Sequence, residues 1–414
     1  MNDILPSEIG AWRRFESTFR HLCSRYGFGE LRTPVVEPTA LFERSIGEAT
    51  DIVQKEMYTF VDKGEKSLTL RPEGTASVVR AYLEHSLFAR DPVTKCIYLG
   101  PMYRRERPAK GRYRQFYQAG AEVLGDSTPF CDAELISLLV RFLEALSISD
   151  IEVLINSVGS PETRSEYRRE LLRYLEPHQQ ALSSDSQQRL SSNPLRILDS
   201  KDPNDQAIVQ DAPKLLDYLA PADQDHLERV VQLIASTGID ATVNPRLVRG
   251  LDYYTGTLFE VVSRSADLGA QNALGGGGRY DGLVEMLGGE PTAAAGFAIG
   301  IERVLLAMNC TPSQGSRLDV CVMSADRGLR DAAFSLVHTL RAHGFHVGVD
   351  WRGLSIKSQM RRADKVGAKF AVILGEREAK TRSVQLKDLG KHTQFEVPIE
   401  GLPARLHDLM KEIE

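Results

Sequence analysis

Residues 102–116, MYRRERPAKGRYRQF, carry six Arg or Lys side chains and a single acid, Glu106, around a central Pro and Gly. The chain of 414 residues has a formal net charge of -5, so this concentration of positive charge is a local feature. The flanking stretches CIYLGPMYRRE and RYRQFYQAGAEVLG are typical of strands. The sequence therefore predicts an antiparallel hairpin with a basic loop at its tip.

The two predicted strands, 97–106 and 113–124, each present one polar face. Strand alternation puts the following side chains on those faces: Arg104 and Glu106 from the first strand, and Arg114, Phe116, Gln118, Gly120 and Glu122 from the second. A solvated surface hairpin is the alternative for such a run of charges. The opposite faces are apolar and the strands contain Gly100, Pro101 and Gly120, which favours burial of the polar face against a ligand.

The overall composition, 42% hydrophobic and 26% charged, is that of an ordinary globular protein large enough for two or three domains. No apolar run approaches the roughly 20 residues that cross a bilayer, and MNDILPSEIG lacks the regions of a signal peptide. We therefore expect a cytoplasmic protein with no membrane partner. The five cysteines form no C-x-x-C pair, and no metal site is assigned to protein side chains.

The order of predicted elements divides the chain. Short strands and helices that follow no regular βαβ alternation predict an α+β domain around an antiparallel sheet, over residues 1–316. Within it, residues 160–242 are polar and helical, which predicts a helical insertion. After a linker rich in Pro, Gly and Ser, residues 317–414 alternate strand and helix and predict a compact α/β domain.

Charge is distributed unevenly between these two predicted domains. Residues from Arg317 onward contain 17 basic and 13 acidic side chains, against 34 basic and 43 acidic before it. This asymmetry favours a polyanion as partner of the tail. The stretch DWRGLSIKSQMRRADKVGAK contributes five cations on and before one predicted helix, namely Arg352, Lys357, Arg361, Arg362 and Lys365. A solvated helix face is the alternative for any one of them.

Three stretches together resemble the class II aminoacyl-tRNA synthetases. YRRERPAKGRYRQF fits the motif 2 pattern of that family, FRxE, a loop, then RxxxF. GFAIGIERVLLAM, with Arg303, is similar to motif 3, and YGFGELRTPVVEP, with Pro34, loosely resembles motif 1. LVRGLDYYTGTLFEV, GGGGRYDGL and LRPEGT resemble the signature peptides and substrate loop of the histidyl-tRNA synthetases, so the likeness runs nearly from end to end. A dinucleotide or P-loop enzyme is disfavoured, because neither G-x-G-x-x-G nor a Walker A sequence occurs.

The resemblance implies a fold and a reaction. The expected catalytic domain has a mostly antiparallel sheet of six to seven strands flanked by helices, with the helical insertion, and the tail becomes an anticodon-binding domain with a mixed five-stranded sheet. The implied reaction joins histidine to the α-phosphate of ATP and passes the histidyl group to tRNA(His). Mg²⁺ would bridge the ATP phosphates, and the enzyme would be a homodimer with motif 1 at the interface.

The resemblance also implies roles for cations and for an ATP pocket. Arg104 would contact the histidine carboxylate and the α-phosphate, Arg249 would be a further cation at the α-phosphate, and Arg303 would bind the γ-phosphate. Glu106 would bind the adenine amino group, Phe116 would stack on the base, and Arg112 would also contact ATP. Arginine suits phosphoryl oxygens because its planar fork binds two at once. A surface or ion-pair role is the alternative for each arginine, and is favoured for Arg105, Arg107 and Arg114.

Histidine would be held by donors and acceptors at both ring nitrogens and the ammonium group. By resemblance, Glu122 and Tyr254 are the imidazole partners, Glu73, Thr75 and Gln118 contact the amino group with Tyr253 nearby, and Gly276 and Gly277 let the backbone approach. The tyrosine pair could instead be a cross-strand packing pair. Candidate tRNA contacts are Arg107, Lys110, Arg352, Arg361 and Arg362, and the loop 107–112 is the candidate reader of the extra 5′ guanosine.

Other functional classes stay open at this stage. A regulatory paralogue that works with ATP phosphoribosyltransferase would lack the tail domain and would have an altered RGLDYY peptide. This chain contains both the tail domain and an intact RGLDYY. A prolyl, threonyl or glycyl enzyme would lack RGLDYYTGTLFE and GGGGRYDGL, and a non-catalytic RNA-binding module would not need Arg104, Arg249 and Arg303 together. A hydrogen-bonding histidine site can reject analogues by about 10⁴ without editing. The insertion is therefore expected to clasp the tRNA acceptor arm.

Overall fold

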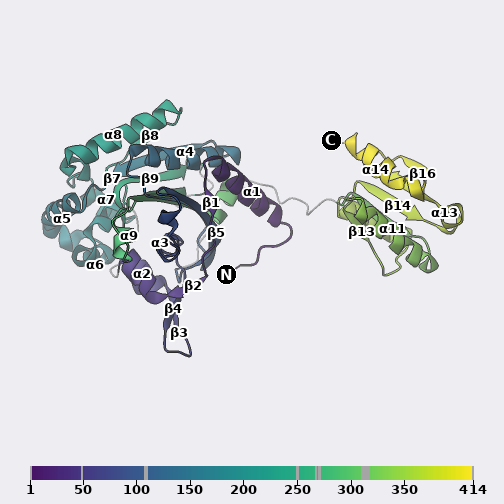
Figure 1. The fold of residues 1–414 in the computed structure, drawn as a ribbon, viewed down its shortest axis with the longest axis horizontal. Helices are drawn as coiled ribbons and strands as arrows, with labels where there is room; N and C mark the ends of the chain where they lie inside the picture. Colours follow the sequence, from purple (N-terminus) through teal and green to yellow (C-terminus); the bar gives the residue numbers. More distant parts are fainter. Residues whose placement is uncertain are drawn as a thin grey trace. The chain divides into compact units, whose positions relative to one another are not determined.

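The computed structural model describes residues 2–47, 50–106, 111–248, 251–265, 268, 272–308 and 318–412. It divides into two compact units, a larger one whose main segment is Ala11–Cys310 and a smaller one whose main segment is Thr311–Glu414 (Figure 1). The domain boundary predicted at 316/317 falls in residues 309–317, outside the described residues.

An eight-stranded sheet forms the centre of the larger unit. Its strands, in spatial order, are β1 (Gly29–Glu30), β5 (Thr94–Tyr103), β6 (Gln115–Leu124), β11 (Ala294–Gly300), β10 (Ala273–Arg279), β9 (Thr255–Ser263), β7 (Ile151–Ser157) and β8 (Ala241–Val243). All neighbours pair antiparallel except β1 with β5 and β7 with β8. The predicted α+β class is confirmed. The sheet is wider than the six to seven strands expected, because the short strands β1 and β8 extend its edges.

The basic stretch forms the predicted hairpin. β5 and β6 pair in a register that puts Tyr98 opposite Gly120 and Met102 opposite Phe116. These residues share their face of the sheet with Gln118 and Glu122, as the alternation predicts. A second, three-stranded antiparallel sheet has the order β2 (Val36–Pro38), β4 (Ser67–Leu70) and β3 (Tyr58–Val61), and a turn at Lys63 and Gly64 joins β3 to β4.

Helices of the larger unit bury their apolar faces on this framework. They are α1 (Ile9–Arg25), α2 (Thr39–Ile46), α3 (Thr75–Glu84), α4 (Pro129–Ala145), α9 (Leu283–Met286) and α10 (Ile301–Ala307). The first helix packs onto α4, since the rings of Phe15 and Phe19 lie 4.9 and 5.1 Å from that of Phe142. α4 in turn contacts β9, β10 and β11, while α3 contacts β6.

The predicted helical insertion contains four α-helices, with short 3-10 turns between them. These helices are α5 (Pro161–Leu175), α6 (Ser184–Ser192), α7 (Pro203–Val209) and α8 (Pro221–Ser236). Figure 1 shows them gathered beside the β7–β8 edge of the sheet, and α8 contacts both of those strands. Tyr167, Leu171 and Leu175 of α5 belong to the same hydrophobic cluster as Tyr253 and Tyr280, so the insertion shares a core with the sheet domain.

The smaller unit is a mixed five-stranded sheet with helices, which confirms the predicted tail. The strand order is β13 (Val347–Val349), β12 (Val320–Ser324), β14 (Phe370–Leu374), β15 (Ser383–Asp388) and β16 (Gln394–Pro398). The helices are α11 (Arg330–Ala342), α12 (Ile356–Lys365), α13 (Glu376–Thr381) and α14 (Leu402–Lys411). The sequence analysis did not predict α13, a six-residue helix with no buried residue. Without an apolar stripe, the periodicity that signals a helix is absent.

Candidate active site

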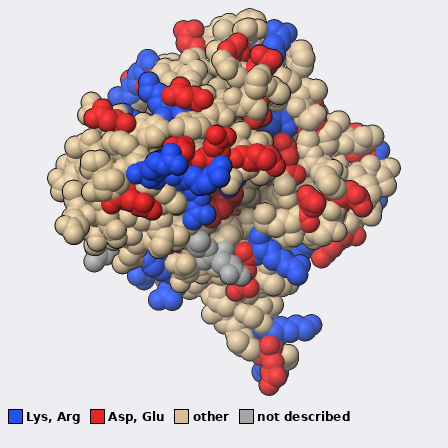
Figure 2. Space-filling view, turned by 90° about the vertical axis from the view of Figure 1, so that its left-hand side faces the viewer, with Lys and Arg blue, Asp and Glu red and all other residues tan. Residues whose placement is uncertain are grey.

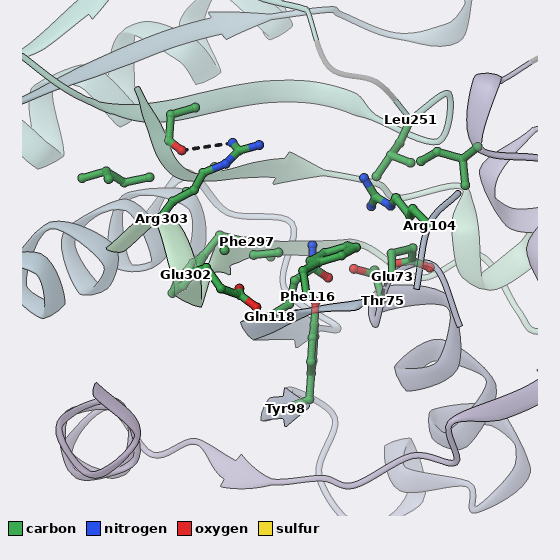
Figure 3. Close-up of a pocket in the computed structure, with 18 of the residues that line it drawn as sticks. Glu73, Thr75, Tyr98, Arg104, Phe116, Gln118, Leu251, Phe297, Glu302 and Arg303 are labelled. Atoms are coloured by element: carbon green, nitrogen blue, oxygen red, sulfur yellow. Dashed lines mark hydrogen bonds between the residues drawn. The ribbon is translucent and has the colours of Figure 1, made fainter. Parts of the chain in front are cut away.

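A cavity of about 230 Å³ opens over the polar face of the β5–β6 hairpin, next to β10 and β11. The predicted site residues that line it are Glu73, Thr75, Arg104, Glu106, Arg112, Phe116, Gln118, Glu122, Tyr253, Tyr254, Gly276 and Arg303. Figure 3 shows Arg303 and Arg104 on opposite sides, with Phe297 and Phe116 between them and Glu73 and Thr75 beside Arg104. Stretches that are far apart in the sequence therefore meet in one cavity.

Arg104 follows directly after β5 and is held by the backbone. Its Nε donates a 2.9 Å hydrogen bond to the carbonyl oxygen of Pro72, and its guanidinium carbon lies 5.2 Å from the centre of the Phe116 ring. A cation at this distance over an aromatic face is attracted by the ring quadrupole. These contacts orient the planar fork, whose two NH₂ groups can meet an anion in the pocket.

Arg303 lies in the first turn of α10, on the other side of the cavity. It donates hydrogen bonds from Nη1 to the carbonyl oxygen of Ala273 at 3.2 Å and from Nε to that of Gly111 at 3.4 Å. Burial lowers its pKa, and the neighbouring cation Arg112 lowers it further. Arg303 and Arg112, two cations close together in a partly buried pocket, make a strong anion site.

Glu122 is 1% exposed and receives two hydroxyl donors. Thr75 Oγ1 donates to its Oε1 at 2.8 Å, and Tyr280 Oη donates to its Oε2 at 2.5 Å. Burial raises the pKa of this carboxyl to about 8, against the opposing effect of the two hydroxyls. A Cβ atom at Gly296 would lie 1.7 Å from Oε2, so only glycine lets β11 pass this close to the carboxyl.

Glu73 is a second buried carboxyl, 3% exposed, at the start of α3. It accepts backbone N–H bonds from Thr75 at 2.6 Å and Ala76 at 2.9 Å. Burial raises its pKa, while these N–H groups and the nearby Arg104 oppose the rise. The buried Oε1 of Gln118 has no hydrogen-bond partner among the described residues. This part of the pocket therefore offers three acceptor groups to a ligand that carries donors.

Three tyrosine rings close the pocket beside these acceptors. Ring centroids lie 4.8 Å apart for Tyr253 and Tyr254, and 5.6 Å apart for Tyr253 and Tyr280. The pair at 253 and 254 precedes β9 instead of lying within a strand, and both residues line the cavity. Burial raises the pKa values of Tyr253 and Tyr280 well above the usual range, so both hydroxyls stay protonated donors.

The sequence analysis missed Tyr280 and Glu302 as pocket residues. Tyr280 stood inside the quoted GGGGRYDGL, directly after the glycine strand, which was the available signal. Glu302 precedes Arg303, accepts the backbone N–H of Tyr117 at 2.9 Å, and has its pKa raised to about 7 by burial. Nothing in its spacing distinguished it from an ordinary helix acid.

Some candidate residues lie elsewhere. Gly277 is not in the cavity lining, and a Cβ there would lie 1.9 Å from the carbonyl oxygen of Gly296, so this glycine permits close strand pairing. Arg249, Arg107 and Lys110 lie outside the described residues.

In the smaller unit, Arg352 and Arg362 both bind the carboxylate of Asp350, at 2.6 and 2.5 Å, which lowers the pKa of Asp350. Arg361 is exposed on the same helix, α12. The candidate tRNA surface therefore keeps a positive surplus, although one acid offsets part of it.

Comparison with known proteins gives the same family across the chain. The family model described as "Histidyl-tRNA synthetase" matches residues 1–304, and that described as "Anticodon binding domain" matches residues 319–409. A histidine–tRNA ligase of Sorangium cellulosum (strain So ce56) is 49% identical over 99% of this chain and 95% of its own length. One of Cyanothece sp. (strain PCC 7425 / ATCC 29141) is 50% identical over 95% of this chain and 91% of its own length.

A solved structure shows the same architecture. The crystal structure of apo S. aureus histidyl-tRNA synthetase matches with a TM-score of 0.82 and 35% sequence identity, over 98% of both chains. The similarity thus extends through the sheet domain, the insertion and the tail. No helix of the described residues combines the length and apolar character needed to cross a membrane.

Proposed function

The chain belongs to the histidyl-tRNA synthetase family, and on that premise we infer that it is a histidine–tRNA ligase. It uses ATP to join L-histidine to tRNA(His) through a histidyl-adenylate. The observation that carries this function is the charge arrangement of one cavity. Buried acceptors (Glu73, Gln118 and Glu122) suit the ammonium and imidazole groups of histidine, and arginines suit a carboxylate and a triphosphate.

The first step needs no protein nucleophile. An oxygen of the histidine carboxylate attacks the α-phosphorus of ATP, the bond from that phosphorus to the bridging oxygen breaks, and pyrophosphate leaves. Negative charge gathers at the phosphorus centre, where fixed donors act most strongly. Arg104 lies beside the acceptors in Figure 3, so we assign it to the histidine carboxylate and the α-phosphate together. Arg249 is proposed as a further cation there, from the family resemblance alone.

ATP is assigned to the remainder of the cavity. Arg303 on the opposite side suits the γ-phosphate, with Arg112 as a second cation. The Phe116 ring between the two sides is proposed to stack on adenine. Glu106, which pairs with Arg112 at 3.4 Å, is proposed to accept from the adenine amino group. Each assignment rests on the side chain's chemistry and its place in the cavity lining.

Mg²⁺ bound together with ATP would neutralise negative charge on the phosphates. Enzymes that use ATP hold this ion by one or two carboxylates together with the phosphates. In this cavity Glu302 is the carboxylate that would hold it, since Glu106 is assigned to adenine. In the described part of the chain, no group of three or more His, Cys, Asp or Glu side chains could hold a metal ion by itself. The phosphates would therefore supply most of the ligands.

The second step transfers the histidyl group to the terminal ribose of tRNA(His). The ribose hydroxyl attacks the carbonyl carbon of the adenylate, the mixed anhydride bond breaks, and AMP leaves. The tail is assigned to the anticodon, with Arg352, Arg361 and Arg362 as candidate backbone contacts. Arg107 and Lys110, in the loop 107–112, are candidates for the acceptor end and its extra 5′ guanosine.

The insertion is proposed to clasp the acceptor arm. Figure 2, which faces the end of the molecule where Figure 1 shows α5 and α6, has Lys and Arg in small clusters with Asp and Glu between them. On such a surface, RNA phosphates would contact separate small clusters of Lys and Arg and not one continuous basic patch. The insertion is not assigned to editing, since a hydrogen-bonding site can exclude other amino acids at the first step.

We further propose a homodimer in the cytoplasm, where ATP and tRNA are available. Val36 of β2, within the motif 1 stretch, and Phe60 of β3 are 40% and 44% exposed on the same face of the three-stranded sheet. Exposed apolar side chains that lie together on one sheet mark an association surface. Light scattering on the purified protein measures its mass, and a mass of one chain would contradict the dimer.

ATP–pyrophosphate exchange with each amino acid offered singly tests the function. Exchange with histidine alone is the expected result, because the buried acceptors Glu73, Gln118 and Glu122 suit its ammonium and imidazole groups together. Histidine binding without exchange would favour the regulatory paralogue, and exchange with another amino acid would favour a different class II enzyme.

A further inference from the structure

The segment Leu251–Tyr254 forms one wall of the cavity and has no regular secondary structure. We call it the tyrosine segment, since it carries Tyr253 and Tyr254. On one side it rests against the end of α2, where Asp252 N donates to the carbonyl oxygen of Ile46 at 3.4 Å. A Cβ at Gly47, whose φ is +98°, would lie 3.0 Å from Asp252 Oδ2. The segment therefore fits closely against α2, where the described residues show one long backbone hydrogen bond.

The helical insertion supplies bonds on the other side. Arg164 of α5 donates from Nη1 to the carbonyl oxygen of Tyr254 at 2.5 Å and from Nη2 to that of Asp252 at 3.3 Å. Asn193, directly after α6, donates from Nδ2 to Asp252 Oδ1 at 2.6 Å. Backbone carbonyls outside a helix or strand need such partners. A guanidinium can bridge two of them because its donors are fixed in one plane.

A second cavity, of about 480 Å³, lies between the insertion and this segment. Its lining includes Arg164, Arg168 and Asn193 from the insertion, and it shares Leu251, Tyr253 and Tyr254 with the first cavity. The tyrosine segment is thus a thin wall between two cavities. Its tyrosine rings pack in the core beside Tyr280, while the bonds from the insertion hold the backbone that carries them.

We propose that Arg164 and Asn193 are positioning residues for histidine binding, so that the insertion forms part of the amino-acid site as well as a surface for tRNA. This inference rests on the proposed function. Loss of their bonds releases the carbonyls on either side of Tyr253, and a displacement of about 1 Å in a binding group is enough to cost about 10²-fold in activity. The larger effect is expected on histidine, because the groups assigned to ATP, apart from Arg249, come from β5, β6, the loop between them and α10.

The test is ATP–pyrophosphate exchange without tRNA, so that contacts of the insertion with nucleic acid cannot contribute. Arg164→Ala is expected to raise the KM for histidine by about tenfold or more and to change the KM for ATP by less than about twofold. Arg164→Lys, a single-point donor, is expected to lie between Arg164→Ala and wild type. Arg168→Ala is the matched control, because Arg168 is exposed in the same second cavity and carries the same charge. It should behave as wild type.

Equal KM values for histidine in Arg164→Ala and Arg168→Ala would overturn the proposal. It would also be overturned if Arg164→Ala raised the KM values for histidine and ATP equally and lowered the Tm. A double-mutant cycle of Asn193→Ala and Asp252→Ala keeps it testable if Arg164→Ala fails to fold. Their effects on the KM for histidine should not add, since Asn193 acts through Asp252, and additive effects would contradict the proposal. Wild-type protein without histidine exchange would refute the proposed function instead.

Discussion

Tyr280 Oη lies 2.5 Å from Glu122 Oε2, and this hydrogen bond joins the residue after the glycine strand β10 to the middle of the hairpin strand β6. Both side chains are 1% exposed, so neither can exchange its partner for water. The bond fixes the carboxyl that is assigned to the imidazole.

Tyr280→Phe removes this donor without changing the ring. We expect the KM for histidine to rise by about 10- to 100-fold, because a buried acceptor oxygen of Glu122 is left without its donor. The KM for ATP should stay unchanged in the exchange assay. Tyr174→Phe is the control, since it removes a tyrosine hydroxyl that binds the carbonyl oxygen of Ile208 within the insertion. Equal KM values for histidine in the two variants would refute the role given to Tyr280.

Glu122→Gln should make stability less dependent on pH. Burial raises the pKa of the folded carboxyl from 4.5 to about 8, so the folded state holds this proton more tightly than the unfolded state. Its contribution to stability is fully present below pH 4.5 and is lost as the pH rises to about 8, at about 1.4 kcal/mol for each unit of pKa difference. In urea unfolding at pH 5.5, 7 and 8.5, the free energy of unfolding of wild type should therefore fall relative to that of the variant as the pH rises.

The same variant should bind histidine poorly, which separates stability from function at this residue. A rise in the KM for histidine of about 10- to 100-fold is expected, because Gln puts an NH₂ donor where one of the two acceptor oxygens of the carboxyl lies. A constant free-energy difference between wild type and variant over the three pH values would contradict the raised pKa.

Arg104→Lys should lower the kcat of exchange by about 10²- to 10³-fold, the range measured when one fixed donor to a transition state is lost. Lysine keeps the charge but cannot bond the Pro72 carbonyl and two phosphate oxygens at once. Arg105→Lys is the matched control, because Arg105 is exposed next to it. Comparable kcat values for the two variants would show that Arg104 does not act in the reaction.

Gly296→Ala should abolish histidine binding. The added Cβ would lie 1.7 Å from Glu122 Oε2 and 2.7 Å from the carbonyl oxygen of Ala121, so the carboxyl must leave its place and β6 must shift, and the Tm of the variant is measured alongside binding. Calorimetric titration with histidine measures the loss directly. Gly282→Ala, with nothing within 4 Å of its Cβ, is the control and should bind as wild type does. Unchanged binding in Gly296→Ala would show that the position of Glu122 does not matter.

Asp132→Asn should destabilise the larger unit. Asp132 Oδ2 accepts from Arg279 Nη2 at 2.7 Å, and both side chains are almost fully buried. Removal of one partner from a buried pair costs about 3 to 5 kcal/mol of unfolding free energy, because the other charge stays buried. Glu144→Gln breaks the exposed pair with Arg141 and should cost at most about 1 kcal/mol. Equal losses of unfolding free energy in the two variants, measured by chemical denaturation, would contradict the cost assigned to the buried pair.

Much of the fold could be predicted because the local patterns are strong. The hairpin face follows from strand alternation, since the period of two puts Phe116, Gln118 and Glu122 together whatever surrounds them. The helix α13 was missed because its six residues bury nothing and leave no periodic trace.

The chain alone determined the identity of the charged groups and their order along the strands and helices, and the resemblance of its motifs supplied the family. Only the tertiary structure decided which distant groups share one cavity: Glu73 with Glu122, Tyr280 with Glu122, and Arg164 with the tyrosine segment. Their separation along the chain carries no local signal. Burial and raised pKa values depend on what packs around a group, so they exist only once the sheet and the insertion have assembled.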